Sequence, residues 1–147
     1  MKKCVLWLSF ILMLLSAASP LLAQSPHFNN GPVWRVIYLN IKPGMADPFW
    51  TDIKENLKPI YDEYKKQGWL VDYKFYTNPV AEHPDDWNVA IALEYKTWGT
   101  IDEMGEKATT IVEKHYGSHQ SSVDAGKKRS EYATTVRNSL AREVTLK

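Results

Sequence analysis

Cysteine is almost absent from this sequence of 147 residues, and its single cysteine, Cys4, lies in an N-terminal segment that we expect to be removed. The mature chain would then have no disulfide, no thiol nucleophile and no cysteine-ligated metal. A strong charge of one sign is also missing, because 18 Lys and Arg residues stand against 17 Asp and Glu residues. Losing Lys2 and Lys3 changes the formal charge from +1 to −1. Neither value favours nucleic acid or an anionic membrane as a partner.

A long apolar run occurs only near the N-terminus. Lys2 and Lys3 precede an apolar stretch from Val5 to Leu15, and small residues follow it, which is typical of a secretory signal peptide over residues 1–23. We expect cleavage after Ala23, with Ala18 as the alternative site. The run is shorter than the roughly 20 residues of a spanning helix, so we expect no stable membrane insertion after cleavage. The protein is therefore predicted to be secreted or periplasmic.

Recognisable catalytic signatures are absent as well. The sequence contains no Gly-rich phosphate loop, nucleophile elbow, Ser-His-Asp order or nucleotide fingerprint. Whether the protein is an enzyme therefore stays open, and no cofactor is predicted.

A clear strand pattern is present between Trp87 and Trp98. Val89, Ile91, Leu93 and Tyr95 alternate with small or polar residues, which is the period of a β-strand. Since one face is apolar and the other is small enough to be covered too, we expect this strand in the middle of a sheet.

The rest of the chain divides into elements around that strand. Residues 24–32 hold two prolines and a glycine and are expected to be a flexible leader to a domain over residues 33–147. Further strands are predicted at 33–42, 69–76 and 139–147. One helix is predicted from Asp47 to Gly68, kinked at Pro59, and a second from a capping box at Thr100 to Gly117. A third, shorter helix is expected within 118–137.

This order, β-α-β-β-α-(α)-β, predicts an α+β ferredoxin-like sandwich with its helices on one face of an antiparallel sheet. The first strand is apolar on both sides. Its two faces carry Val33, Ile37, Leu39 and Ile41 on one side and Trp34, Val36, Tyr38 and Asn40 on the other. We therefore expect that neither face of the sheet is exposed to solvent.

The chain resembles the dimeric α+β barrel superfamily of ferredoxin-like domains. The resemblance rests on Ile41-Lys42-Pro43-Gly44 after the first strand, Gly68 before the second, and Leu93-Glu94-Tyr95 leading into the second helix. It is similar to the antibiotic-biosynthesis monooxygenase-like group and to small uncharacterised secreted domains. The resemblance implies a homodimer in which two sheets close over a central cavity.

The same resemblance directs attention to particular residues. Monooxygenases of this kind often carry a Trp at the end of the third strand and a His on the next helix, where this sequence has Tyr95 and Met104. Haem-binding relatives use a helical histidine, for which His115 is the candidate. Our ligand-binding candidates are Trp34, Tyr73 and Met104, with Tyr38 also at the cavity.

Three functions follow as alternatives. The first is binding of a small apolar or aromatic molecule without turnover. The second is a cofactor-independent monooxygenase or isomerase with His115 as base and Tyr38 or Asn40 at an oxyanion. The third is an interaction protein with a barrel filled by side chains. His115 and His119 have the spacing of metal ligands, but Gly117 separates them and no third ligand is evident, so no metal site is predicted.

Overall fold

The computed structural model describes residues 27–80, 82–83 and 86–147. The predicted signal peptide and the start of the predicted leader lie outside these residues. The elements follow the order β1 (Phe28–Ile41), α2 (Ala46–Asp52), η1 (Ile53–Leu57), α3 (Lys58–Lys66), β2 (Leu70–Thr77), β3 (Val89–Tyr95), α4 (Trp98–Tyr116), α5 (His119–Tyr132) and β4 (Ala133–Leu146).

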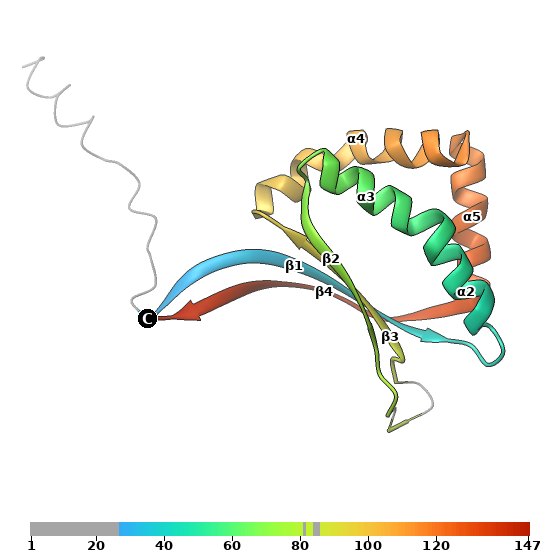
Figure 1. Cartoon of the computed structure of the whole chain (residues 1–147), viewed down its shortest axis with the longest axis horizontal. Coiled ribbons are helices and arrows are strands. Elements are labelled where there is room, and N and C mark those ends of the chain that lie inside the picture. The colour runs from blue at the N-terminus through green and yellow to red at the C-terminus, as the bar shows by residue number, and fades with distance from the viewer. Residues whose placement is uncertain (1–26, 81, 84–85) are drawn as a thin grey trace, which may run out of the picture. The chain divides into compact units, whose positions relative to one another are not determined.

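The four strands form one sheet in the order β2-β3-β1-β4. β3 pairs antiparallel with β1, Ile37 lying opposite Ile91, and antiparallel with β2, Phe75 lying opposite Ile91. The predicted central place of residues 89–95 is therefore confirmed. Within residues 30–143 all the helices cover the same face of the sheet (Figure 1), so the predicted α+β class is confirmed too.

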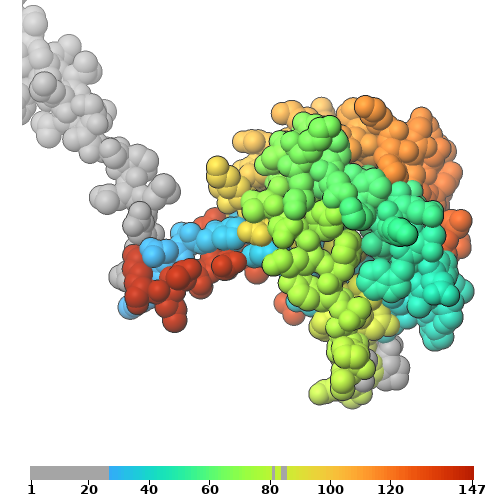
Figure 2. Space-filling model, in the orientation of Figure 1, coloured from blue at the N-terminus to red at the C-terminus, as the bar shows by residue number. Residues whose placement is uncertain are grey.

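The helix-covered face holds the hydrophobic core. Val33, Phe49 and Ile91 are almost fully buried, together with Leu93 and Tyr64. The α2–α3 segment and the α4–α5 segment form one continuous layer in the space-filling view (Figure 2). Trp34, Val36 and Tyr38 alternate with the buried residues of β1 and lie on the opposite face, which no helix of the described residues covers. We call this the open face.

The predicted kink at Pro59 takes the form of a π-helical turn. η1 separates α2 from α3, and the backbone N–H of Lys58 bonds to the carbonyl of Ile53, five residues back. Pro59 follows at the start of α3. Because proline has no N–H to give to the preceding turn, the helix widens by one residue before it. Turns of this kind occur often at functional sites.

β2 contains a bulge that changes which side chains face the helices. The register shifts between Leu70 and Asp72, so Val71 has no partner in β3. Leu70 is 3% exposed and Val71 51% exposed. Strict alternation would place Val71 on the same face as Tyr73 and Phe75, but the bulge inserts one extra residue and leaves Val71 exposed.

Several predicted boundaries also move. The Thr97 hydroxyl caps α4, so the helix begins before the predicted capping box at Thr100, whereas Gly117 ends it at φ 85° as expected. β4 begins at Ala133 rather than at Ser139. β1 begins at Phe28, so residues 28–32 of the expected leader are strand.

Residues 30–143 form one compact unit, and the ends of β1 and β4 belong to a second. Within the second unit, the backbone N–H of Lys147 donates to the carbonyl of His27 at 3.1 Å. In the described part of the chain, no helix combines the length and the hydropathy needed to cross a bilayer.

Candidate functional site

The open face carries a hollow of about 460 Å³. Ala90 and Ala92 of β3 form its floor, and both are only 2% exposed although no helix covers them. The walls come from larger side chains on both neighbouring strands and on the loop before β3. They are Trp34, Val36 and Tyr38 of β1, Lys74, Tyr76 and Thr77 of β2, and Trp87. Small residues between aromatic neighbours therefore create the space.

The aromatic walls are ordered by contacts among themselves and with charged groups. Tyr38 and Trp87 meet edge to face, with ring centroids 5.3 Å apart. The Lys74 ammonium lies 5.5 Å from the centroid of the Trp34 ring, a cation–π distance. The Trp34 indole N–H donates to Oε2 of Glu143 on β4 at 3.1 Å. The hollow thus offers flat apolar surface together with a few polar groups.

Asn40 lies beyond this hollow, at the end of β1. Its Nδ2 donates to the carbonyl of Asp86 at 2.7 Å, and its Oδ1 accepts from Asn88 at 3.4 Å. Asn88 Oδ1 in turn accepts from the backbone N–H of Ile41 at 2.8 Å. Asn40 therefore ties the loop before β3 to the end of β1, and its amide donor is already engaged.

Two of the predicted ligand-binding residues lie on the other face of the sheet. Tyr73 packs against Tyr61 of α3 and donates from its hydroxyl to Asp62 Oδ1 at 2.6 Å. Met104 is 8% exposed within the core. The placement of Tyr73 and Met104 beside Trp34 and Tyr38 is therefore corrected: alternation along β2 brings Lys74 and Tyr76 to the open face instead. That alternation was visible in the sequence.

Asp62 lies at the surface, where its carboxylate accepts hydrogen bonds from Lys58 and Tyr73. The hydrogen bond from Lys58, assisted by that from Tyr73, lowers the pKa of Asp62. Burial, with the Asp62 contact, raises the pKa of Tyr73. The Tyr73 bond holds β2 against α3, whereas the Lys58 bond lies within α3, and neither serves the hollow.

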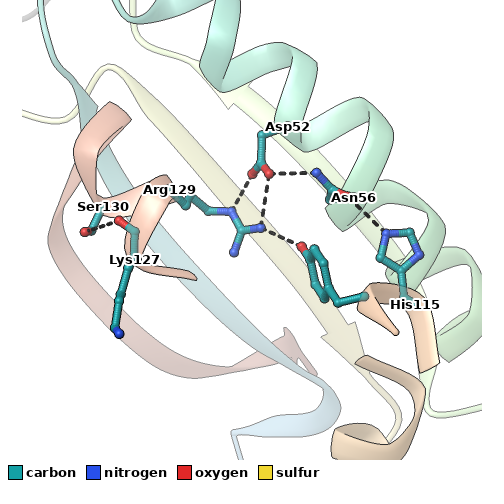
Figure 3. Close-up of polar contacts among 7 residues, drawn as sticks. Asp52, Asn56, His115, Lys127, Arg129 and Ser130 are labelled. Carbon is teal, nitrogen blue, oxygen red and sulfur yellow. Dashed lines mark hydrogen bonds and ion pairs between the residues drawn. The ribbon is translucent and has the colours of Figure 1, made fainter. Parts of the chain in front are cut away.

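His115 also lies on the helix-covered side, within a polar chain. Its Nε2 is 3.2 Å from Oδ1 of Asn56, and Asn56 Nδ2 donates to Asp52 at 2.9 Å. Figure 3 shows this chain running from α4 across η1 to α5. The structure does not bring His115 together with Tyr38 or Asn40, because the sheet lies between them. The predicted acid–base set is therefore not assembled within the chain.

Arg129 completes the polar chain, and sequence reasoning missed it. Its Nε donates to Asp52 Oδ2 at 2.5 Å and its Nη2 to the Tyr116 hydroxyl at 2.9 Å. Burial opposes the guanidinium charge, but the bonds and charge of Asp52 outweigh it and raise the pKa of Arg129. A short basic run such as Lys127-Lys128-Arg129 is typical of a solvated helix face. That holds for Lys127, which pairs with Asp124, but not for Arg129.

The two histidines considered as metal ligands, His115 and His119, have different partners. His119 Nδ1 lies 2.8 Å from Glu113 Oε1, whereas His115 bonds to Asn56. Among the described residues no group of three or more His, Cys, Asp or Glu side chains is placed to hold a metal ion.

Comparison with known proteins supports the fold. No protein-family model and no curated protein matches the sequence. A dimeric ferredoxin-like protein from an uncultured marine organism superposes with a TM-score of 0.52 at 11% identity, covering 80% of this chain and 90% of the other. HapK from Hahella chejuensis superposes at 0.51 with 10% identity, covering 76% and 91%. The chain has a ferredoxin-like α+β fold, and its expected likeness to dimeric α+β barrels is confirmed at the level of the fold.

Proposed function

We propose that this protein is a secreted or periplasmic homodimer that binds a small apolar or aromatic molecule between its two sheets. The observation that carries the proposal is the hollow of about 460 Å³ on the open face, with its alanine floor and aromatic walls. Ligand sites typically have volumes of about 300–1,000 Å³ and combine apolar walls with a few polar groups.

A second copy is the occupant that best suits the open face. Trp34, Val36 and Tyr38 are only half-buried in the single chain, and aromatic side chains of this kind are enriched where proteins associate. The marine protein of similar fold is described as dimeric. Two open faces meeting in this way would remove the remaining aromatic surface from water and turn each shallow hollow into part of a chamber.

Binding without turnover accounts best for the groups in this hollow. His115 lies behind the sheet, and Asn40 is engaged with Asp86. Tyr38 and Tyr76 supply hydroxyl groups, and Lys74 supplies a charge. These groups can orient a ligand, but they do not form a nucleophile and base in contact with each other.

The dimer is tested by placing a charge on the open face. We expect Val36→Lys to convert the protein to a monomer, because two ammonium groups would be buried against apolar surface. The readout is light scattering coupled to size exclusion. The matched control is Thr109→Lys, which adds the same charge to an exposed position of α4 and should leave the dimer intact. A monomeric wild-type protein would overturn the proposal.

The ligand is tested by native mass spectrometry of the protein purified from its own host. We expect a bound molecule of low mass that is lost in Val36→Lys and retained in Thr109→Lys. A stable dimer that carries no molecule and takes up no apolar or aromatic compound would instead favour the interaction protein with a filled barrel.

The location is tested separately by N-terminal sequencing of the protein from a fractionated culture. Export with cleavage predicts Gln24 as the first residue in the periplasm or medium, or Ser19 if the alternative site is used. An intact N-terminus in the cytoplasm would contradict the proposed location and leave the dimer proposal standing.

A further inference from the structure

A second hollow, of about 300 Å³, lies on the helix-covered side of the sheet beside α5. Leu39, Phe49 and Ala133 give it an apolar interior. Arg129 and the hydroxyl residues Thr134 and Thr135 stand at the same hollow, and none of the described residues that line it is acidic. An apolar interior with one guanidinium is the composition of a site for an amphipathic anion.

Hydrogen bonds hold the Arg129 side chain in place through two of its three guanidinium nitrogens. Nε and Nη2 are committed to Asp52 and Tyr116. Nη1 has no hydrogen-bond partner among the described residues, and Figure 3 shows it pointing away from Asp52. Since an arginine carries five N–H donors, the two on Nη1 are available to an acceptor from outside the chain.

Asp52 orients Arg129 without occupying this hollow. Asp52 lines a separate hollow, together with Asn56 and Lys128. Lys42 Nζ donates to the carbonyl of Ser130, the residue after Arg129, at 3.0 Å. Arg129 is the one charged side chain among the described residues that line the hollow beside α5.

The backbone adds an independent observation. Asp52 immediately precedes the π-helical turn, and Asn56 belongs to it. A partly buried ion pair contributes little net stability compared with apolar packing, and π turns concentrate at functional sites. The widened turn that precedes Pro59 thus adjoins this partly buried pair, an arrangement that recurs at functional sites.

We infer that the hollow beside α5 binds a small monocarboxylate with an apolar tail. The tail lies against Phe49 and Leu39, and the carboxylate accepts from Nη1 of Arg129 in a charge-assisted hydrogen bond. This site is on the opposite side of the sheet from the proposed dimer chamber and is independent of it.

The test uses hexanoate, with hexan-1-ol and hexylamine as neutral and cationic analogues of the same tail. Dissociation constants are measured by NMR titration of the full-length mature protein. We expect hexanoate to bind at least tenfold more tightly than either analogue, with shift changes at Gly126, Arg129 and Thr134. Equal binding of all three, shift changes confined to the open face, or no binding up to the solubility limit would overturn the inference.

Gly126 provides a blocking variant that should fold. It lies within α5 at the edge of the hollow, and an added Cβ there would meet no atom within 4 Å. We expect Gly126→Leu to fill the space and weaken hexanoate at least tenfold, and Gly126→Ala to change it less than threefold.

Arg129→Lys tests the guanidinium itself, with circular dichroism to verify the fold. Lysine keeps the positive charge but lacks the planar set of N–H donors of the guanidinium, so this variant should bind hexanoate at least fivefold more weakly. Unchanged affinity in both Gly126→Leu and Arg129→Lys would show that hexanoate binds elsewhere.

Discussion

Arg129 and Asp52 form the least exposed ion pair among the described residues, with side chains 24% and 13% exposed. The other pairs, such as Lys127 with Asp124, lie at the surface. The depth matters because a charge left without its partner in such a place keeps its desolvation penalty.

Asp52→Ala should therefore destabilise the protein. It leaves the guanidinium of Arg129 half-buried with only Tyr116 as partner and removes the acceptor of Asn56. Loss of one partner of a fully buried pair costs about 3–5 kcal/mol, and partial exposure here reduces our expectation to about 2 kcal/mol. Urea unfolding measures it. Lys127→Ala is the control, and an equal effect in both variants would contradict the argument from burial.

Three buried tyrosines predict a loss of stability in alkali. Burial raises the pKa of Tyr64 to about 12, and it also raises the pKa values of Tyr61 and Tyr95. In the unfolded chain a tyrosine loses its proton near pH 10. The unfolded state therefore holds fewer protons between about pH 10 and 12, so stability is complete below pH 10 and is lost as the pH rises through that window.

The measurement is the urea midpoint at about pH 8, 10 and 11.5, values that span the tyrosine titration, with ultraviolet absorbance to follow ionisation. Tyr64→Phe removes one of the three groups. After allowance for the partial contact of Tyr64 with solvent, the loss of unfolding free energy over this pH range should be smaller by about 1 kcal/mol in the variant. An identical decline in wild type and Tyr64→Phe would show that Tyr64 is not one of the groups responsible.

At the scale of elements, the sequence predicted what depends on local pattern. The alternation in residues 89–95 was sufficient to predict β3, and the glycine at 117 was sufficient to predict the end of α4. Both features depend on only a few neighbouring residues. The bulge at Val71 was not predictable, since it depends on where β3 places Tyr95 opposite Leu70. The kink at Pro59 was predicted, but its π form depends on how the widened turn packs.

Two glycines in comparable open space should respond oppositely to alanine. An added Cβ meets nothing within 4 Å at either Gly126 or Gly117. Gly126 lies inside α5, so Gly126→Ala should stabilise the protein by about 1 kcal/mol through helix propensity. Gly117 ends α4 at φ 85°, so Gly117→Ala should destabilise it by about 1–2 kcal/mol.

Thermal unfolding of both variants measures this contrast. Because neither substitution makes a contact, only the backbone conformation can separate them. Shifts of the same sign would mean that the end of α4 is not held in the left-handed conformation.

At the scale of the whole molecule, the sequence predicted the two-faced sheet but not the site. The sequence places Trp34 and Tyr38 on the face of β1 opposite the core, because they alternate with buried neighbours along the strand, and the structure has them there. His115 was expected near Tyr38, and the error arose because residues so far apart in sequence carry no local signal of which layer each occupies. Arg129 was missed for the same reason: its partner Asp52 is on another helix.

The proposed assembly makes a prediction for Lys74 that does not depend on any ligand. Lys74 is exposed in the single chain and lies at the open face, as shown by its contact with Trp34, whereas Lys54 is exposed on the helical layer. If a second copy covers the open face, an amine-acetylating reagent should modify Lys74 at least fivefold more slowly in the wild type than in Val36→Lys. Lys54 should react equally in both, because no partner covers the helices. Peptide mass spectrometry at a series of times gives both rates from one sample. Equal rates for Lys74 in the two proteins would mean that the dimer, if present, uses another surface.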